Sequence, residues 1–114
     1  MDASDIMDIR ERTMRVLGAK LPSYMIGRKT THWSVDDLTD SEYERLRWAE
    51  RVILNFKTGP YPWDDVTLRT WFMGMNPRLG PDDHNNPAIF IREGRGDEVL
   101  RAAKGDYFDG SMGA

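Results

Sequence analysis

The sequence predicts an all-α fold, a small helical domain of about five to six short helices. Between stretches rich in glycine and proline, apolar residues recur at three- and four-residue steps, which places them on one side of a helix. Thr39 and Glu42 have the spacing of a capping box, a signature that begins a helix. Only the run 89–91 could form a strand, and it has no second run to pair with.

The first half of the chain contains three expected helices. Asp5 can cap a helix that runs to about Ala19, and a shorter helix is expected over 21–26, with Gly27 closing it. The clearest helix follows Thr39. Its expected buried stripe is Tyr43, Leu46, Ala49, Ile53 and Phe56. On its polar side, Glu44 lies three residues before Arg47, within reach of an ion pair along the helix.

Three further helices are expected in the second half. Asp64 or Asp65 can cap one that ends at Gly74, and Asn86 with Pro87 begins another that ends at Gly94. The last is expected over 97–104, with acidic residues at its start and Gly105 after its end. The remaining segment, 106–114, is short, acidic and aromatic, and is expected to gain order only on a partner.

Composition restricts the class of protein. A chain of 114 residues without cysteine is one small domain that has no disulfide framework, thiolate zinc site or cysteine nucleophile. No apolar run is long enough for a bilayer span, and the charged start does not resemble a signal peptide, so a soluble, cytoplasmic protein is expected. The net charge of −3 is uneven: residues 1–33 hold six basic and four acidic side chains, a weak indication of a nucleic-acid-facing part.

No catalytic motif is recognisable, and neither an enzyme nor a cofactor is expected. The paired carboxylates at 36–37, 64–65 and 82–83 stand where helices or turns begin, which explains them without chemistry. The acidic residues around His84 lack the spacing of a calcium loop, so no metal site is predicted. Four tryptophans indicate core packing, but Trp48, off the main stripe, and Trp63, in a loop, could equally belong to a partner surface.

The order of expected elements in the N-terminal half is typical of a helix-turn-helix. A supporting helix and a turn near Gly27 precede a polar segment of the residue types that contact phosphates and base edges. The candidate DNA-binding residues are therefore Arg28, Lys29, Thr30, Thr31 and His32.

The second half resembles a known family. The run from Leu68 through Trp71, Asn76-Pro77 and Leu79-Gly80 is followed by Pro87, by 91–94, and by Val99-Leu100 with Ala102-Ala103. This order of anchors, about 40 residues long, is similar to the toxin-binding domain of Xre/MbcA/ParS antitoxins, many of which also carry a helix-turn-helix. The resemblance divides the chain into a helix-turn-helix-like part, 1–57, and a toxin-binding part, 58–114, within one unit.

The resemblance implies an antitoxin that neutralises a RES-type, NAD-consuming toxin through its C-terminal segment and can repress its operon as a homo-oligomer on operator DNA. The residues implied in toxin binding are Trp71, Asn76, Arg78, Asp106, Tyr107 and Phe108. The alternative is a non-catalytic interaction or regulatory protein, of a kind that phages carry, that binds a host protein without binding DNA.

Overall fold

All the regular secondary structure of the described chain is helical. The computed structural model describes residues 8–80 and 84–113, the last four as backbone only, and these ranges contain six α-helices, two 3-10 turns and no strand. The α-helices are α1 (Ile9–Leu17), α2 (Lys20–Ile26), α3 (Asp40–Lys57), α4 (Asp65–Met73), α5 (Pro87–Arg92) and α6 (Gly96–Gly113). The 3-10 turns are η2 (Val35–Asp37) and η3 (Pro77–Leu79). The predicted all-α class is confirmed.

Several helix ends follow their expected signals. Thr39 and Glu42 form the capping box at the start of α3, with the backbone N–H of Glu42 donating to the Thr39 hydroxyl. Gly27 closes α2 in the left-handed region, at φ 91°, where its missing Cβ removes the steric penalty. The first helix is capped by Asp8, whose carboxylate accepts from the N–H of Glu11; the expected cap Asp5 lies outside the described residues.

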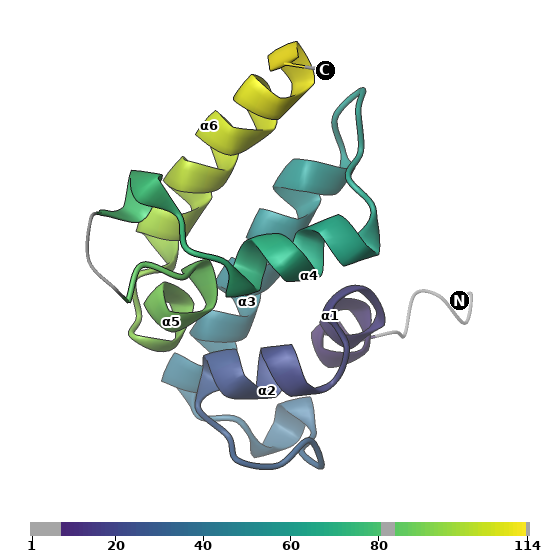
Figure 1. Cartoon of the computed structure of the whole chain (residues 1–114). Helices are drawn as coiled ribbons and strands as arrows, with labels where there is room; N and C mark the ends of the chain where they lie inside the picture. The colour runs from purple at the N-terminus through teal and green to yellow at the C-terminus, as the bar shows by residue number, and fades with distance from the viewer. Residues whose placement is uncertain (1–7, 81–83, 114) are drawn as a thin grey trace.

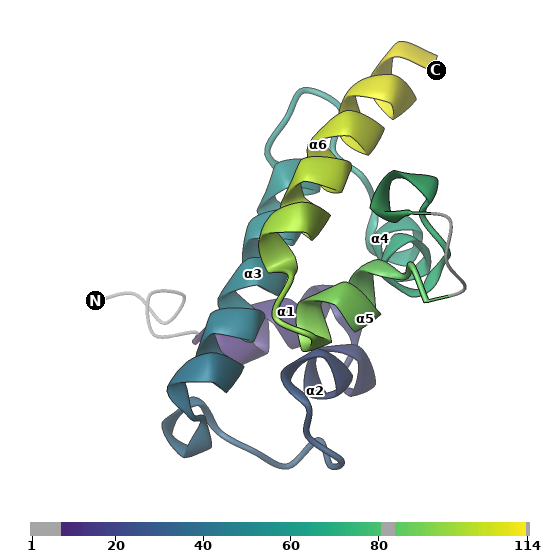
Figure 2. The ribbon, with the colours of Figure 1, turned by 90° about the vertical axis from the view of Figure 1, so that its left-hand side faces the viewer.

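The two long helices, α3 and α6, are the frame of the molecule. They lie side by side and run in the same direction, and they make the most extensive helix–helix contact (Figure 2). The short helices α1 and α2 lie at one end, while the last turns of α6 form the end farthest from α2 (Figure 1). This arrangement leaves the end of α6 beside the loop that joins α3 to α4.

One apolar core joins both halves of the sequence. It combines buried side chains of α1, α2 and α3 with those of α4, α5 and α6, including Phe56, Leu68, Phe72, Ile91 and Val99. A smaller cluster lies under the other end of α3, around Ile9, Ile26, Trp33 and Leu46. The buried stripe predicted for α3 is confirmed at Leu46, Ala49, Ile53 and Phe56.

Tyr43 was expected on that stripe and is instead 39% exposed. Its neighbour Arg45 reaches back to the carbonyl of Ile26, so the first turns of α3 are held to the body by a polar contact on another side of the helix. Spacing alone does not indicate where along a helix the core ends.

Candidate partner-binding surfaces

The carboxylate of Asp106 joins three elements of the second half. Its Oδ2 accepts from Trp71 Nε1 on α4, at 2.8 Å, and from Asn76 Nδ2, at 2.7 Å. Its Oδ1 accepts from Arg78 Nε on η3, also at 2.7 Å. Four of the six residues implied in toxin binding are thus brought together, and they bind one another within the chain.

Asn76 is held firmly in this cluster. Its side chain is buried, its Oδ1 accepts from the backbone N–H of Arg78, and its own N–H donates to the carbonyl of Asn85. Both ends of the side-chain amide are therefore occupied, one in capping η3 and one on Asp106. The pKa of Arg78 is raised, mainly by its hydrogen bond to Asp106 and then by the charge of Asp109, with which it also forms an ion pair.

These contacts explain why α6 continues past its expected end. The helix was predicted to stop at Gly105, leaving 106–114 without structure, yet it runs to Gly113. A Cβ at Gly105 would lie 2.7 Å from Nη1 of Arg78, so this glycine allows the guanidinium to lie close to the helix backbone. Gly105 is a site of close approach and not a helix terminator.

Of the other two residues implied in toxin binding, Tyr107 packs against the core and Phe108 lies on the surface. Tyr107 is half-buried against Phe56, with ring centroids 6.2 Å apart, and its hydroxyl accepts from the backbone N–H of Tyr61. Phe108 is 63% exposed, and Tyr61, in the neighbouring loop, is 66% exposed. We call the surface around Tyr61, Phe108 and Asp109 the α6 tip. The sequence did not identify Tyr61 and Asp109 as candidate site residues, because neither lies in a motif.

The five candidate DNA-binding residues line one hollow of about 600 Å³, which we call the basic hollow. Lys20, Ser23 and Tyr24 of α2 and Arg92 of α5 complete it, and no acidic side chain is among its lining residues. The candidate segment is a loop here, not a helix, and α2 and α3 are separated by 27–39 instead of a tight turn. Lys20 and Arg92 were missed because they are distant in sequence from the polar segment.

Arg28 is the least available base in the basic hollow. Its Nε and Nη2 bind both carboxylate oxygens of Glu42, at 2.8 and 3.0 Å, and Nη2 also donates to the carbonyl of Asp37. Together with the backbone N–H of Thr39, this guanidinium lowers the pKa of Glu42 from 4.5 to about 2. The segment is also tied at Thr31, whose carbonyl accepts from Arg10.

We expect Glu42→Gln to lower the free energy of unfolding by about 1 kcal/mol at pH 7, because the capping box survives while the charge on Arg28 loses its partner. Since folding lowers this pKa, the ion pair stabilises above pH 4.5 and is lost as the pH falls toward 2. Urea unfolding of both proteins between pH 7 and pH 3 measures the difference, which should shrink as the pH falls. A difference that is constant with pH would contradict this role of Glu42.

A third surface, an apolar groove, was not predicted. Two adjoining hollows of about 290 and 420 Å³ share Leu21, Tyr24 and Met73, and the first is also lined by Ala88 and Ile89 of α5. Met73 is 57% exposed. The sequence signal for this groove is weak, since each of these residues also fits a core position.

The part of the chain that the structure describes contains neither a group of metal-ligating side chains nor a membrane-spanning helix. No three metal-ligating side chains gather there, and no helix combines the length and hydropathy needed to cross a bilayer. His84 is exposed, at the edge of the undescribed segment 81–83.

The chain was also compared with known proteins. No family model, no curated protein and no solved structure matches it. The likeness to Xre/MbcA/ParS antitoxins therefore rests on the motif residues of the sequence alone.

Proposed function

We propose that the protein is a non-catalytic, antitoxin-type protein that binds a partner protein through the α6 tip. The observation that carries the proposal is the threefold hydrogen bonding of Asp106, which fixes the helix that presents Phe108. A segment ordered before binding loses little conformational entropy when it binds. An exposed aromatic side chain on such a segment is a typical anchor for a protein partner.

The partner that the sequence resemblance implies is a RES-type, NAD-consuming toxin. Phe108 and Tyr61 can fill an apolar pocket, and Asp109 can meet a basic rim at the entrance of an active site. A helix inserted in this way blocks access without any chemistry of its own, in the manner of a helix bound in a groove. Only the α6 tip, and not the Asp106 cluster, need then contact the toxin.

Phe108→Ala tests the proposal. We expect it to weaken binding to a co-expressed RES-domain toxin by roughly 30-fold, about 2 kcal/mol, and to leave cellular NAD unprotected. The control is Tyr24→Ala, which removes a 39% exposed aromatic side chain from α2, at the far end of the molecule. Binding is measured by calorimetry with the purified proteins, and NAD is measured in the co-expressing cells.

The outcomes separate cleanly. Binding that is weakened by Phe108→Ala to about the expected extent, together with wild-type binding by Tyr24→Ala, supports the α6 tip. Normal binding by Phe108→Ala contradicts it, as does a protein that binds no RES-domain toxin at all. Binding lost only in Tyr24→Ala places the contact on α2 and also overturns the proposal.

A second candidate function is nucleic-acid binding through the basic hollow. The observation that favours it is the gathering of Lys20, Lys29, His32 and Arg92 in one hollow. Phosphate contacts release counterions, so the affinity should fall steeply as salt rises. The geometry favours backbone contacts over base reading, because no helix presents the segment to a groove.

Lys29→Ala tests this second function. With duplex DNA from the region upstream of the gene that encodes this protein, we expect the slope of log DNA affinity against log salt concentration to become shallower by about one. The control is Lys104→Ala, which removes an exposed lysine from α6. A flat salt dependence in the wild-type protein, or equal effects of the two variants, would exclude the basic hollow as the DNA site.

A further inference from the structure

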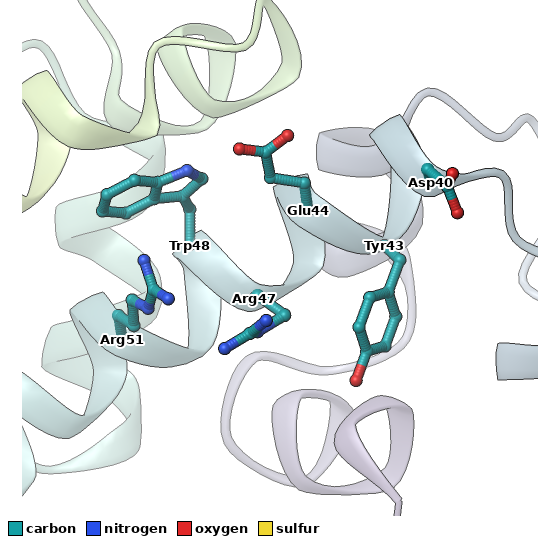
Figure 3. A pocket seen from close by; sticks show the side chains of 6 residues that line it. All are labelled: Asp40, Tyr43, Glu44, Arg47, Trp48 and Arg51. Atoms are coloured by element: carbon teal, nitrogen blue, oxygen red, sulfur yellow. The ribbon is translucent and has the colours of Figure 1, made fainter.

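The outward face of the first three turns of α3 carries two aromatic and four charged side chains. A shallow hollow of about 290 Å³ on this face is lined by six side chains of this one helix (Figure 3). They are Asp40, Tyr43, Glu44, Arg47, Trp48 and Arg51, which we call the α3 face. Trp, Tyr and Arg are the residue types most enriched at the energetic centres of protein interfaces.

The four charged groups of the α3 face have no ion pair within the described residues. The expected pair between Glu44 and Arg47 is not formed, and Arg51 lies over the ring of Trp48 instead, 4.7 Å from its centroid. Other charged residues of α3 are paired: Glu42 with Arg28, Glu50 with Arg12, and Lys57 with Asp65. Apart from Arg45, which donates to the carbonyl of Ile26, the charged side chains of this helix that have no ion pair within the described residues therefore lie on one face.

The order of these six residues is symmetric about the point between Arg45 and Leu46. Asp40 and Arg51 are equally distant from it, as are Glu44 and Arg47, and Tyr43 and Trp48. At 100° per residue, the four charged positions fall within about 60° of one another around the helix, and each aromatic position lies about 40° beyond one edge. The acids occupy the N-terminal half of the stripe and the arginines the C-terminal half.

We propose that the α3 face binds a second copy of this chain, with two α3 helices antiparallel about a two-fold axis through that point. A two-fold interface requires a patch that is complementary to itself. Here the axis places Asp40 opposite the partner's Arg51 and Glu44 opposite the partner's Arg47. Each aromatic side chain lies beside its own symmetry mate, offset along the helix by about 7.5 Å, five residues at 1.5 Å each.

Trp48 is held in a restricted position at this face by the start of α6. A Cβ at Gly96 would lie 2.3 Å from Cγ of Trp48, so the start of α6 packs tightly against the base of the indole and restricts it. The stripe is about 18 Å long, which makes a small interface, and we expect a dimer that dissociates in the micromolar range. This interface is separate from the α6 tip, so dimerisation and toxin binding can be tested independently.

Charge exchange between Glu44 and Arg47 tests the proposal. In sedimentation velocity of the full chain, we expect Glu44→Arg and Arg47→Glu each to be monomeric, because each places like charges opposite one another. The double variant restores the opposite charges and should dimerise like the wild-type protein. An equimolar mixture of the two single variants should form a heterodimer, since one then supplies only arginine and the other only glutamate at these positions.

Arg15→Glu is the matched control, because it reverses an exposed arginine on α1 and should leave the dimer intact. Circular dichroism establishes that all variants fold. A wild-type protein that remains monomeric at the highest concentration overturns the proposal. So does a dimer that survives both single exchanges, or a double variant and a mixture that both stay monomeric. Toxin binding by Glu44→Arg should be unchanged, which separates this result from the proposed function.

Discussion

Phe56→Ala should lower the free energy of unfolding by about 3–5 kcal/mol, the largest effect we expect from one substitution. The ring is fully buried and meets three other aromatic rings. Its centroid is 4.2 Å from that of Trp63, 5.0 Å from that of Trp71 and 6.2 Å from that of Tyr107. Truncation removes contacts from α4, α6 and the loop between α3 and α4 at once, and these rigid neighbours cannot collapse into the space.

Urea unfolding followed by circular dichroism measures this loss, and tryptophan fluorescence should shift to the red as water reaches Trp63 and Trp71. The control is Leu54→Ala on the same helix, where the side chain is 49% exposed and the expected change is within about 0.5 kcal/mol. If Phe56→Ala cost less than Leu54→Ala, the aromatic cluster would not be the centre of the core.

Asp106→Ala should lower the free energy of unfolding by about 2–3 kcal/mol, because it removes the acceptor shared by Trp71, Asn76 and Arg78. The buried amide of Asn76 is the most costly group to leave without a partner. We expect α6 to fray from about residue 105 onward, and the α6 tip to lose its fixed position.

Hydrogen exchange of the amides of 105–109, together with the melting temperature, measures this effect. Asp109→Ala is the control: its carboxylate is more exposed, and within the described residues its ion pair is with Arg78, so the substitution should change stability by less than about 0.5 kcal/mol. Equal exchange in the two variants would show that Asp106 does not hold the helix. A toxin-binding loss in Asp106→Ala that exceeds its loss of stability would add support for the α6 tip.

Much of the helical pattern could be predicted from the sequence because its signals are local. The capping box at Thr39, the proline at the start of α5 and the glycine after α2 each act within one turn of the helix they bound. Propensity and capping are short-range effects, so one sequence suffices to detect them. The start of the first helix and the end of the last were less accurately predicted.

The candidate sites depend on contacts between distant parts of the chain, which no local signal reports. Gly105 has the sequence context of a helix end, and only the arrival of Arg78 from 27 positions earlier gives it another role. The residues of the Asp106 cluster could be named from a family likeness, but their mutual hydrogen bonding could not. Lys20 and Arg92 join the basic hollow for the same reason, through the packing of α2 on α5.

The sharing of one core by both halves of the sequence has a practical consequence. Cutting the backbone between Lys57 and Thr58 would leave two fragments that each carry part of the same buried cluster. Neither fragment could bury its apolar surface alone, whereas together they could reassemble without a covalent link. The molecule is thus suited to fragment complementation, and its two fragments could report the meeting of whatever proteins they are fused to.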